Sequence, residues 1–163
     1  MQYLALNGFR HSLSRYFNST VTCVEQFNWT KSNAAKLART ITRPTTVIGF
    51  SDGATAAITV GNLSPHVVKV YAHSPMFRQE PIRDNINLHL FRTSTDTTPT
   101  FKETGLVYLH YLSTTGPHEV QLQSLPISDH IPVRDLATFI MRIRHHQFHN
   151  CLPYLPQEII RNG

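Results

Sequence analysis

The sequence predicts an α/β fold built on a mainly parallel sheet. Short apolar runs alternate with longer stretches of helical pattern along most of the chain, and parallel strands need such crossover connections. The length of 163 residues fits one domain with a core of its own. Hydrophobic residues make up 40% of the chain and charged residues 15%, which argues against a disordered chain and a coiled coil.

Six short runs rich in apolar and β-branched residues are the expected strands. They cover residues 3–6, 21–25, 45–48, 67–72, 86–91 and 119–125. The first run stops at Asn7-Gly8, a typical turn sequence. The last run alternates apolar and polar residues, as a half-buried strand does.

Helices are expected between and after these strands. They cover residues 11–17, 33–39, 54–60, 101–112 and 133–148. Thr30 and Ser32 are alternative N-caps for the second helix, and Pro44 ends its pattern. Residues 74–85 and 93–100 are expected loops, and the tail after Cys151 is assigned no element.

The formal net charge of +5 comes from arginines that are scattered rather than clustered. Nucleic-acid binding needs a basic patch or stripe, so we do not expect a nucleic-acid partner. The first residues lack the basic start of a signal peptide, and no apolar stretch is long enough to span a bilayer. We therefore expect a cytoplasmic protein without a membrane partner, and homo-oligomer formation stays open. Cys23 and Cys151 are expected to be reduced thiols.

Neither an organic cofactor nor a metal is expected. The chain has no Gly-rich phosphate-binding loop. His145 and His149 lie one helical turn apart, but no carboxylate or cysteine is near enough in sequence to complete a metal site. We expect these histidines on the polar face of the last helix.

The strongest chemical motif is Gly49-Phe50-Ser51-Asp52-Gly53, a G-x-S-x-G pattern. A β-branched strand precedes it and a helix of small residues follows it, which is the context that this motif requires. Glycines on both sides would let a sharp strand-to-helix turn form with Ser51 at its apex. The alternative is a turn whose serine only caps the helix.

The order of elements around this motif resembles the α/β-hydrolase family. Residues 46–54 look like its nucleophile elbow, residues 88–97 like the strand and loop that carry the acid, and residues 120–130 like the last strand and histidine loop. The resemblance implies a doubly wound, six-stranded sheet of order 2-1-3-4-5-6 with helices on both faces. Residues 1–163 would be one truncated core of this fold without a lid domain.

The same resemblance implies a catalytic triad of Ser51, Asp96 and His130. Ser51 would attack a carbonyl, His130 would move the proton, and Asp96 would orient the histidine. The backbone N–H groups of Phe9 and Asp52 would form the oxyanion hole, with the Gly8 N–H as an alternative. The family usually has a histidine where this chain has Asn7, which puts the geometry of that loop in question.

Other acids and histidines compete for the triad. Asp84 and His118 precede strands, so they belong at the wrong end of the sheet, and Asp129 adjoins His130. His73 follows the fourth expected strand and His11 follows the expected oxyanion loop, so both could face the substrate instead. The residues expected to line the substrate are Asn7, His11, His73, Met76 and Phe77.

Two functions remain open. The first is a carboxylesterase or thioesterase that acts on a small-molecule or polymer-borne acyl ester through an acyl-serine intermediate. The second is a catalytically weak or inactive hydrolase scaffold that binds a macromolecular partner. Residues 74–85 are too few to form a lid domain, so an open, shallow site is expected.

Overall fold

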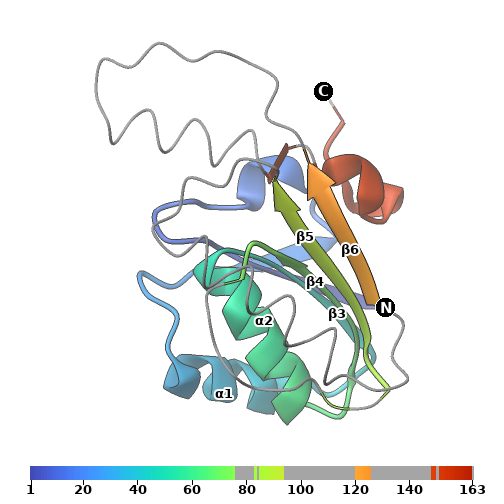
Figure 1. Ribbon diagram of the computed structural model, residues 1–163. Helices are drawn as coiled ribbons and strands as arrows, with labels where there is room; N and C mark the ends of the chain where they lie inside the picture. The colour runs from blue at the N-terminus through green and yellow to red at the C-terminus, as the bar shows by residue number, and fades with distance from the viewer. Residues whose placement is uncertain (76–82, 84, 94–119, 126–147, 150, 163) are drawn as a thin grey trace.

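The computed structural model describes residues 1–75, 83, 85–93, 120–125, 148–149 and 151–162. Six strands within these residues form one sheet in the order β2-β1-β3-β4-β5-β6, and each neighbouring pair is parallel (Figure 1). The strands are β1 (Gln2–Leu6), β2 (Val21–Val24), β3 (Thr45–Phe50), β4 (Val67–His73), β5 (Asn87–Thr93) and β6 (Val120–Leu125). The expected doubly wound sheet and its strand order are confirmed.

Two helices cover one face of this sheet (Figure 1). Helix α1 (Lys31–Thr40) begins at Thr30, whose hydroxyl accepts the N–H of Asn33 while the Asn33 side chain accepts the N–H of Thr30. This reciprocal cap selects Thr30 over Ser32. Helix α2 (Asp52–Leu63) is buried along most of its length because its small side chains let it lie close to β1, β3 and β4.

The opposite face is covered by short 3-10 turns and aromatic side chains. These turns are η1 (Ser14–Tyr16), η2 (Leu152–Tyr154) and η3 (Gln157–Ile159). A second core lies beneath them, in which Tyr16, Phe17 and Phe148 pack against the sheet residues Ile48 and Phe50. Successive side chains along a strand point to opposite faces of the sheet. One set packs in a core beneath the helices and the other in the aromatic core, so both faces of the sheet are buried.

The helix expected over residues 11–17 is wrong in extent, because only Ser14–Tyr16 is helical. The chain at His11 instead folds back onto Gly8 in an antiparallel bridge. The backbone N–H of His11 donates to the carbonyl oxygen of Gly8 in this bridge, so the helical turn begins only after it. The expected helix at 101–112 lies outside the described residues. The same holds for the helix at 133–148, apart from Phe148, which is helical.

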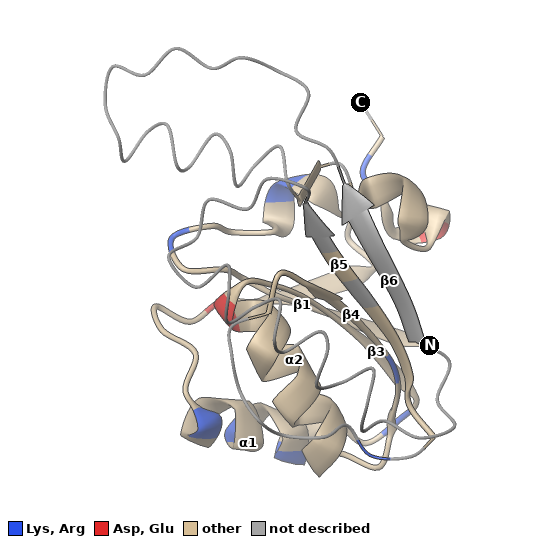
Figure 2. Ribbon diagram, viewed as in Figure 1, with Lys and Arg blue, Asp and Glu red and all other residues tan. Residues whose placement is uncertain are grey.

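In the described residues, the thiols follow the expected pattern, and the basic residues follow it only in part. Lys and Arg gather on α1 and are otherwise spread over separate elements (Figure 2). Cys23 is half-buried and Cys151 is buried, and both are free thiols. No helix in this part of the chain is long and apolar enough to cross a membrane.

Candidate active site

Ser51 stands at the apex of a sharp turn between β3 and α2. Its backbone has φ 57° and ψ −119°, a conformation that costs a residue with a side chain on the order of 1–3 kcal/mol. Such a conformation persists only where the surrounding structure holds it. The contacts around Ser51 must therefore hold its backbone in this conformation.

Hydrogen bonds fix the Ser51 backbone on both sides. Its N–H donates to the carbonyl oxygen of His73 at 2.9 Å, at the end of the neighbouring strand β4. Its carbonyl oxygen accepts the N–H groups of Ala54 and Thr55 at 2.9 and 3.1 Å. The turn is thus bonded to the sheet before it and to the first turn of α2 after it.

The two glycines of the motif permit the close approach that this turn needs. A Cβ atom on Gly49 would lie 2.1 Å from the carbonyl oxygen of Gly53, and one on Gly53 would lie 2.2 Å from that of Leu6. Neither distance is sterically possible. Gly53 therefore brings the first turn of α2 against the end of β1, where the loop after β1 begins.

The side chain of Ser51 makes no capping hydrogen bond to α2. The alternative in which this serine serves only as a helix cap is therefore wrong. The N-terminus of a helix also favours negative charge that develops beside it. This arrangement suits a reactive hydroxyl better than a structural one.

Ser51 is only 2% exposed, so the described residues do not show the expected open, shallow site at this serine. The residue lies between two packed segments. The Asn7–Gly8 segment packs against the turn on one side, and the end of β4 bonds to it on the other. A reacting carbonyl must reach below the surface to meet this hydroxyl.

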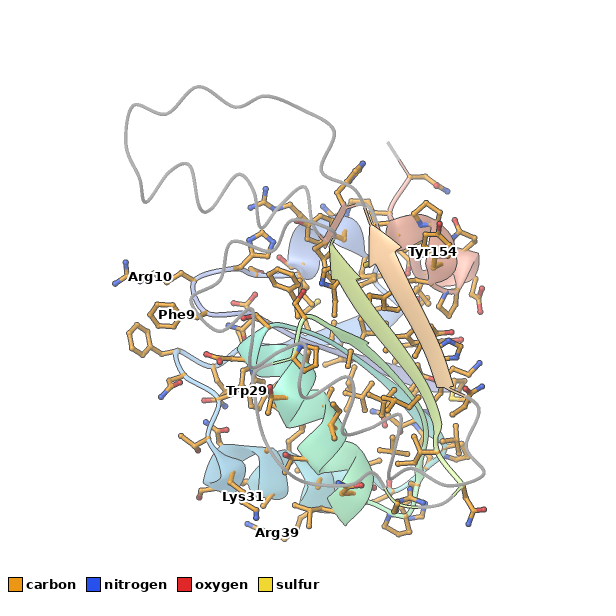
Figure 3. The ribbon with its side chains drawn as sticks, in the orientation of Figure 1. Phe9, Arg10, Trp29, Lys31, Arg39 and Tyr154 are labelled. Carbon is orange, nitrogen blue, oxygen red and sulfur yellow. The ribbon has the colours of Figure 1, made fainter. Side chains whose placement is uncertain are left out.

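The loop after β1 is a tight turn with Phe9 and Arg10 at its tip. Gly8 and His11 exchange two backbone hydrogen bonds of 3.0 Å, and Arg10 has φ 55°. Figure 3 shows the Phe9 and Arg10 side chains pointing outward at this tip. Because the Gly8 N–H already bonds to His11, it is removed as the alternative oxyanion donor, and the Phe9 N–H stays a prediction.

This loop lies directly against the residue before Ser51. A Cβ atom on Gly8 would lie 2.8 Å from Cδ1 and 3.0 Å from the carbonyl oxygen of Phe50. The N–H of Asp52, the second predicted donor, is at the first position of α2, where no intrahelical acceptor exists. The structure therefore brings the two segments that carry the predicted donors together.

Asn7 is the centre of a hydrogen-bond network that the sequence did not reveal. Its side-chain oxygen accepts the N–H of Gln26 and the indole N–H of Trp29, both at 2.9 Å. Its side-chain nitrogen donates to the carbonyl oxygens of Gln26 at 2.8 Å and Gly8 at 3.1 Å. Trp29 carries no sequence motif, so only the fold could connect it to this loop.

His11 and His73 both lie beneath the turn, packed against Phe50. The His11 ring is 2% exposed, and its Nε2 lies 3.0 Å from the hydroxyl of Tyr16, whose pKa burial raises. The His73 ring is 1% exposed, and its Nδ1 lies 3.1 Å from the hydroxyl of Ser74. Their ring centroids lie 5.3 and 5.2 Å from that of Phe50. In the described residues, both therefore support the turn from below.

A cavity of about 360 Å³ lies beside the loop, at the carboxyl ends of β1 and β2. Its lining includes two predicted substrate-lining residues, Asn7 and His11, together with Arg10, Glu25 and Phe27. Phe27 is 77% exposed and meets Phe9 edge to face, with 5.6 Å between ring centroids. The cavity thus has polar walls and an aromatic rim.

The other predicted site residues lie outside the described residues. These are Asp96, His130, Met76 and Phe77. In the sequence, Asp96 comes three residues after β5 and His130 five residues after β6. Both strands run parallel to β3 in one sheet, so the chain leaves each of them at the sheet edge where Ser51 lies.

The fold recurs in solved structures of low sequence identity. A YdeN-like hydrolase from Pectobacterium atrosepticum has a TM-score of 0.58 and 15% identity, over 91% of each chain. Arabidopsis thaliana SOBER1 has a TM-score of 0.52 and 9% identity, over 91% of this chain and 97% of its own. Esterase PE8 has a TM-score of 0.50 and 14% identity, over 88% and 91%. No family model and no curated protein matches the sequence.

Proposed function

We propose that this chain, which has an α/β-hydrolase fold, is a serine hydrolase of the carboxylesterase or thioesterase type. The observation that carries the proposal is the backbone of Ser51, held at φ 57° on a strand-to-helix turn. The fold alone supports many functions. A strained serine at the N-terminus of a helix, beside a glycine loop, supports nucleophilic chemistry in particular.

In the proposed reaction, the Ser51 oxygen attacks the carbonyl carbon of the ester or thioester while His130 takes the hydroxyl proton. The tetrahedral intermediate then expels the alcohol or thiol, which leaves with the proton from His130. Water attacks the acyl-serine with His130 again as base, and the acid and free Ser51 are released. Asp96 orients His130 and stabilises its charged form.

The oxyanion of the intermediate would accept hydrogen bonds from the Phe9 and Asp52 N–H groups. Each such donor contributes about 3–4 kcal/mol to transition-state stabilisation. Their segments support this role, because Gly8 packs on Phe50 and Gly53 packs on the end of β1. The positive end of the α2 dipole adds to the same stabilisation.

The buried position of Ser51 favours a slender acyl group, and the cavity beside the loop after β1 is the candidate pocket for a polar substituent. The cavity of about 360 Å³ is bordered by Arg10, Glu25 and Phe27, so it can take polar and aromatic contacts. A small-molecule ester or the protruding acyl group of a polymer fits this description.

Hydrolysis of ester and thioester panels tests the proposal. Initial rates would be compared for the wild type and for Ser51→Ala, His130→Ala and Asp96→Asn, with exposed Arg39→Ala as the control. We expect the first two variants to lose at least about 10³-fold in kcat/KM and Arg39→Ala to keep wild-type rates. Hydrolysis that survives Ser51→Ala would contradict the proposal. Salt-sensitive association with a macromolecule, without hydrolysis, would select the binding scaffold instead.

A further inference from the structure

We infer that Asn7, held by Trp29, is a positioning residue that sets the direction of the Phe9 N–H in the oxyanion hole. This inference rests on the proposed serine-hydrolase function and deepens it. It concerns a side chain that would not touch the substrate's reacting atoms. Asn7 acts through the peptide bond between Gly8 and Phe9.

The Gly8–Phe9 peptide is held through its carbonyl oxygen. That oxygen accepts the Asn7 side-chain N–H at 3.1 Å and the His11 backbone N–H at 3.0 Å. A peptide unit is planar, and in the trans form its N–H points opposite to its C=O. The chain contains no cis peptide bond among its described residues. Two bonds on the Gly8 oxygen therefore fix the orientation of the Phe9 N–H.

Asn7 is itself held rigidly by the loop after β2. Its amide exchanges a pair of hydrogen bonds with the Gln26 backbone, at 2.9 and 2.8 Å. The Trp29 indole N–H reaches both the side-chain and the backbone oxygen of Asn7, at 2.9 and 3.1 Å. Asn7 is 8% exposed and Trp29 4%, so water competes little for these bonds. Figure 3 shows Trp29 beside α2, on the side of the oxyanion loop.

The same backbone also borders the helix that carries the second donor. A Cβ atom on Gly53 would lie 2.4 Å from the Asn7 carbonyl oxygen, and Trp29 bonds to that oxygen. The network thus fixes the loop peptide relative to the first turn of α2. An oxyanion hole needs this relation, because its two donors must converge on one point.

Asn7→Ala tests the role, with Asn7→Asp and Trp29→Phe as graded variants. Asn7→Asp keeps the acceptor for the Trp29 and Gln26 N–H groups but lacks the donor to the Gly8 and Gln26 carbonyl oxygens. Trp29→Phe removes the indole N–H together with part of the buried ring volume. Asn33→Ala is the matched control, since Asn33 makes a similar set of bonds in the α1 cap, to Thr30 and Asn28.

The measurements are kcat, KM and the rate of Ser51 phosphonylation by a fluorophosphonate, at a temperature where each variant is folded by circular dichroism. We expect Asn7→Ala and Asn7→Asp to lose about 10²-fold in kcat and in phosphonylation rate, with KM within about threefold. Trp29→Phe should lose about tenfold. Asn33→Ala should be less stable but keep wild-type kcat.

Trp29 is the single tryptophan of the chain, so its indole N–H gives one resonance that reports on the network. We expect phosphonylation of Ser51 to shift this resonance in the wild type. An unshifted resonance, or equal kcat in Asn7→Asp and Asn33→Ala, would overturn the positioning role while Ser51 stays reactive. Folded wild-type protein that is not labelled at Ser51 would overturn the proposed function and this inference together.

Discussion

The N–H of Ser51 donates a 2.9 Å hydrogen bond to the carbonyl oxygen of His73. This bond ties the strained turn to the end of the neighbouring strand rather than to its own helix. His73 is buried against Phe50 and Phe91, so its carbonyl has little freedom to follow a relaxing turn. The hydrogen bond to the sheet therefore helps to hold Ser51 in a backbone conformation that is otherwise unfavourable.

Replacement of Ser51 separates this strain from the chemistry. Ser51→Gly should be more stable than Ser51→Ala by about 1 kcal/mol, because glycine adopts positive φ without a Cβ penalty. Both variants lack the hydroxyl, so neither should hydrolyse esters. Urea unfolding compares their free energies of unfolding. A Ser51→Gly variant less stable than Ser51→Ala would show that the turn is not strained.

Two glycines of α2 should respond differently to alanine. Gly53→Ala would place its Cβ 2.2 Å from the backbone oxygen of Leu6, so we expect a loss of more than about 3 kcal/mol or failure to fold. Gly61→Ala would meet the ends of Ile86 and Val70 side chains at 3.1 Å, and helix propensity offsets part of that cost by about 1 kcal/mol. Thermal unfolding should leave Gly61→Ala close to the wild type. Equal losses in both variants would contradict the close packing of α2 on β1.

Arg83 should be a strong contributor to stability away from the site. Its guanidinium donates to the carbonyl oxygens of Gly61 at 2.8 Å, Ser64 at 2.8 Å and Val67 at 2.7 Å. Burial lowers its pKa, yet arginine keeps its charge at neutral pH. Arg83→Met leaves these carbonyls without their donor, and we expect a loss of about 2–4 kcal/mol in urea unfolding.

Arg39→Ala is the control for Arg83, since Arg39 is exposed on α1. Its effect should stay within about 0.5 kcal/mol. If Arg83→Met lost no more stability than Arg39→Ala, the end of α2 would not depend on this side chain.

Alkaline pH should destabilise the protein through Cys151. Burial raises the pKa of this thiol above its ordinary value of 9.0, so the unfolded chain releases the proton first. Stability from this group is complete below about pH 9 and falls as pH rises toward the folded pKa, by at most about 1.4 kcal/mol per pH unit. Tyr16, whose pKa burial also raises, acts in the same direction.

Urea unfolding from about pH 8 to about pH 10.5 measures this slope. Cys151→Ala loses packing at every pH, but its free energy of unfolding should decline less steeply than that of the wild type. Parallel slopes for the two proteins would mean that Cys151 ionises in the folded state as easily as in the unfolded chain.

The sequence predicted the strands and the strand-to-helix turn at Ser51 because their signals are local. Apolar runs and turn residues mark each strand, and the glycines around Ser51 mark a close approach. The extent of η1 was missed because a bridge between Gly8 and His11 depends on the loop geometry. The burial of Ser51 and the hydrogen bond between Asn7 and Trp29 both depend on segments that are distant in the sequence. A single sequence gives no signal for either feature.

Fluorophosphonate labelling of the folded wild-type protein is the most direct test of whether Ser51 is an activated nucleophile. Intact-protein and peptide mass spectrometry would locate the adduct, with Ser51→Ala and His130→Ala measured alongside. We expect one adduct per chain, on Ser51, absent in Ser51→Ala and lost or greatly slowed in His130→Ala. Folded wild-type protein that stays unlabelled, or an adduct elsewhere that persists in Ser51→Ala, would contradict the assignment of Ser51 as an activated nucleophile.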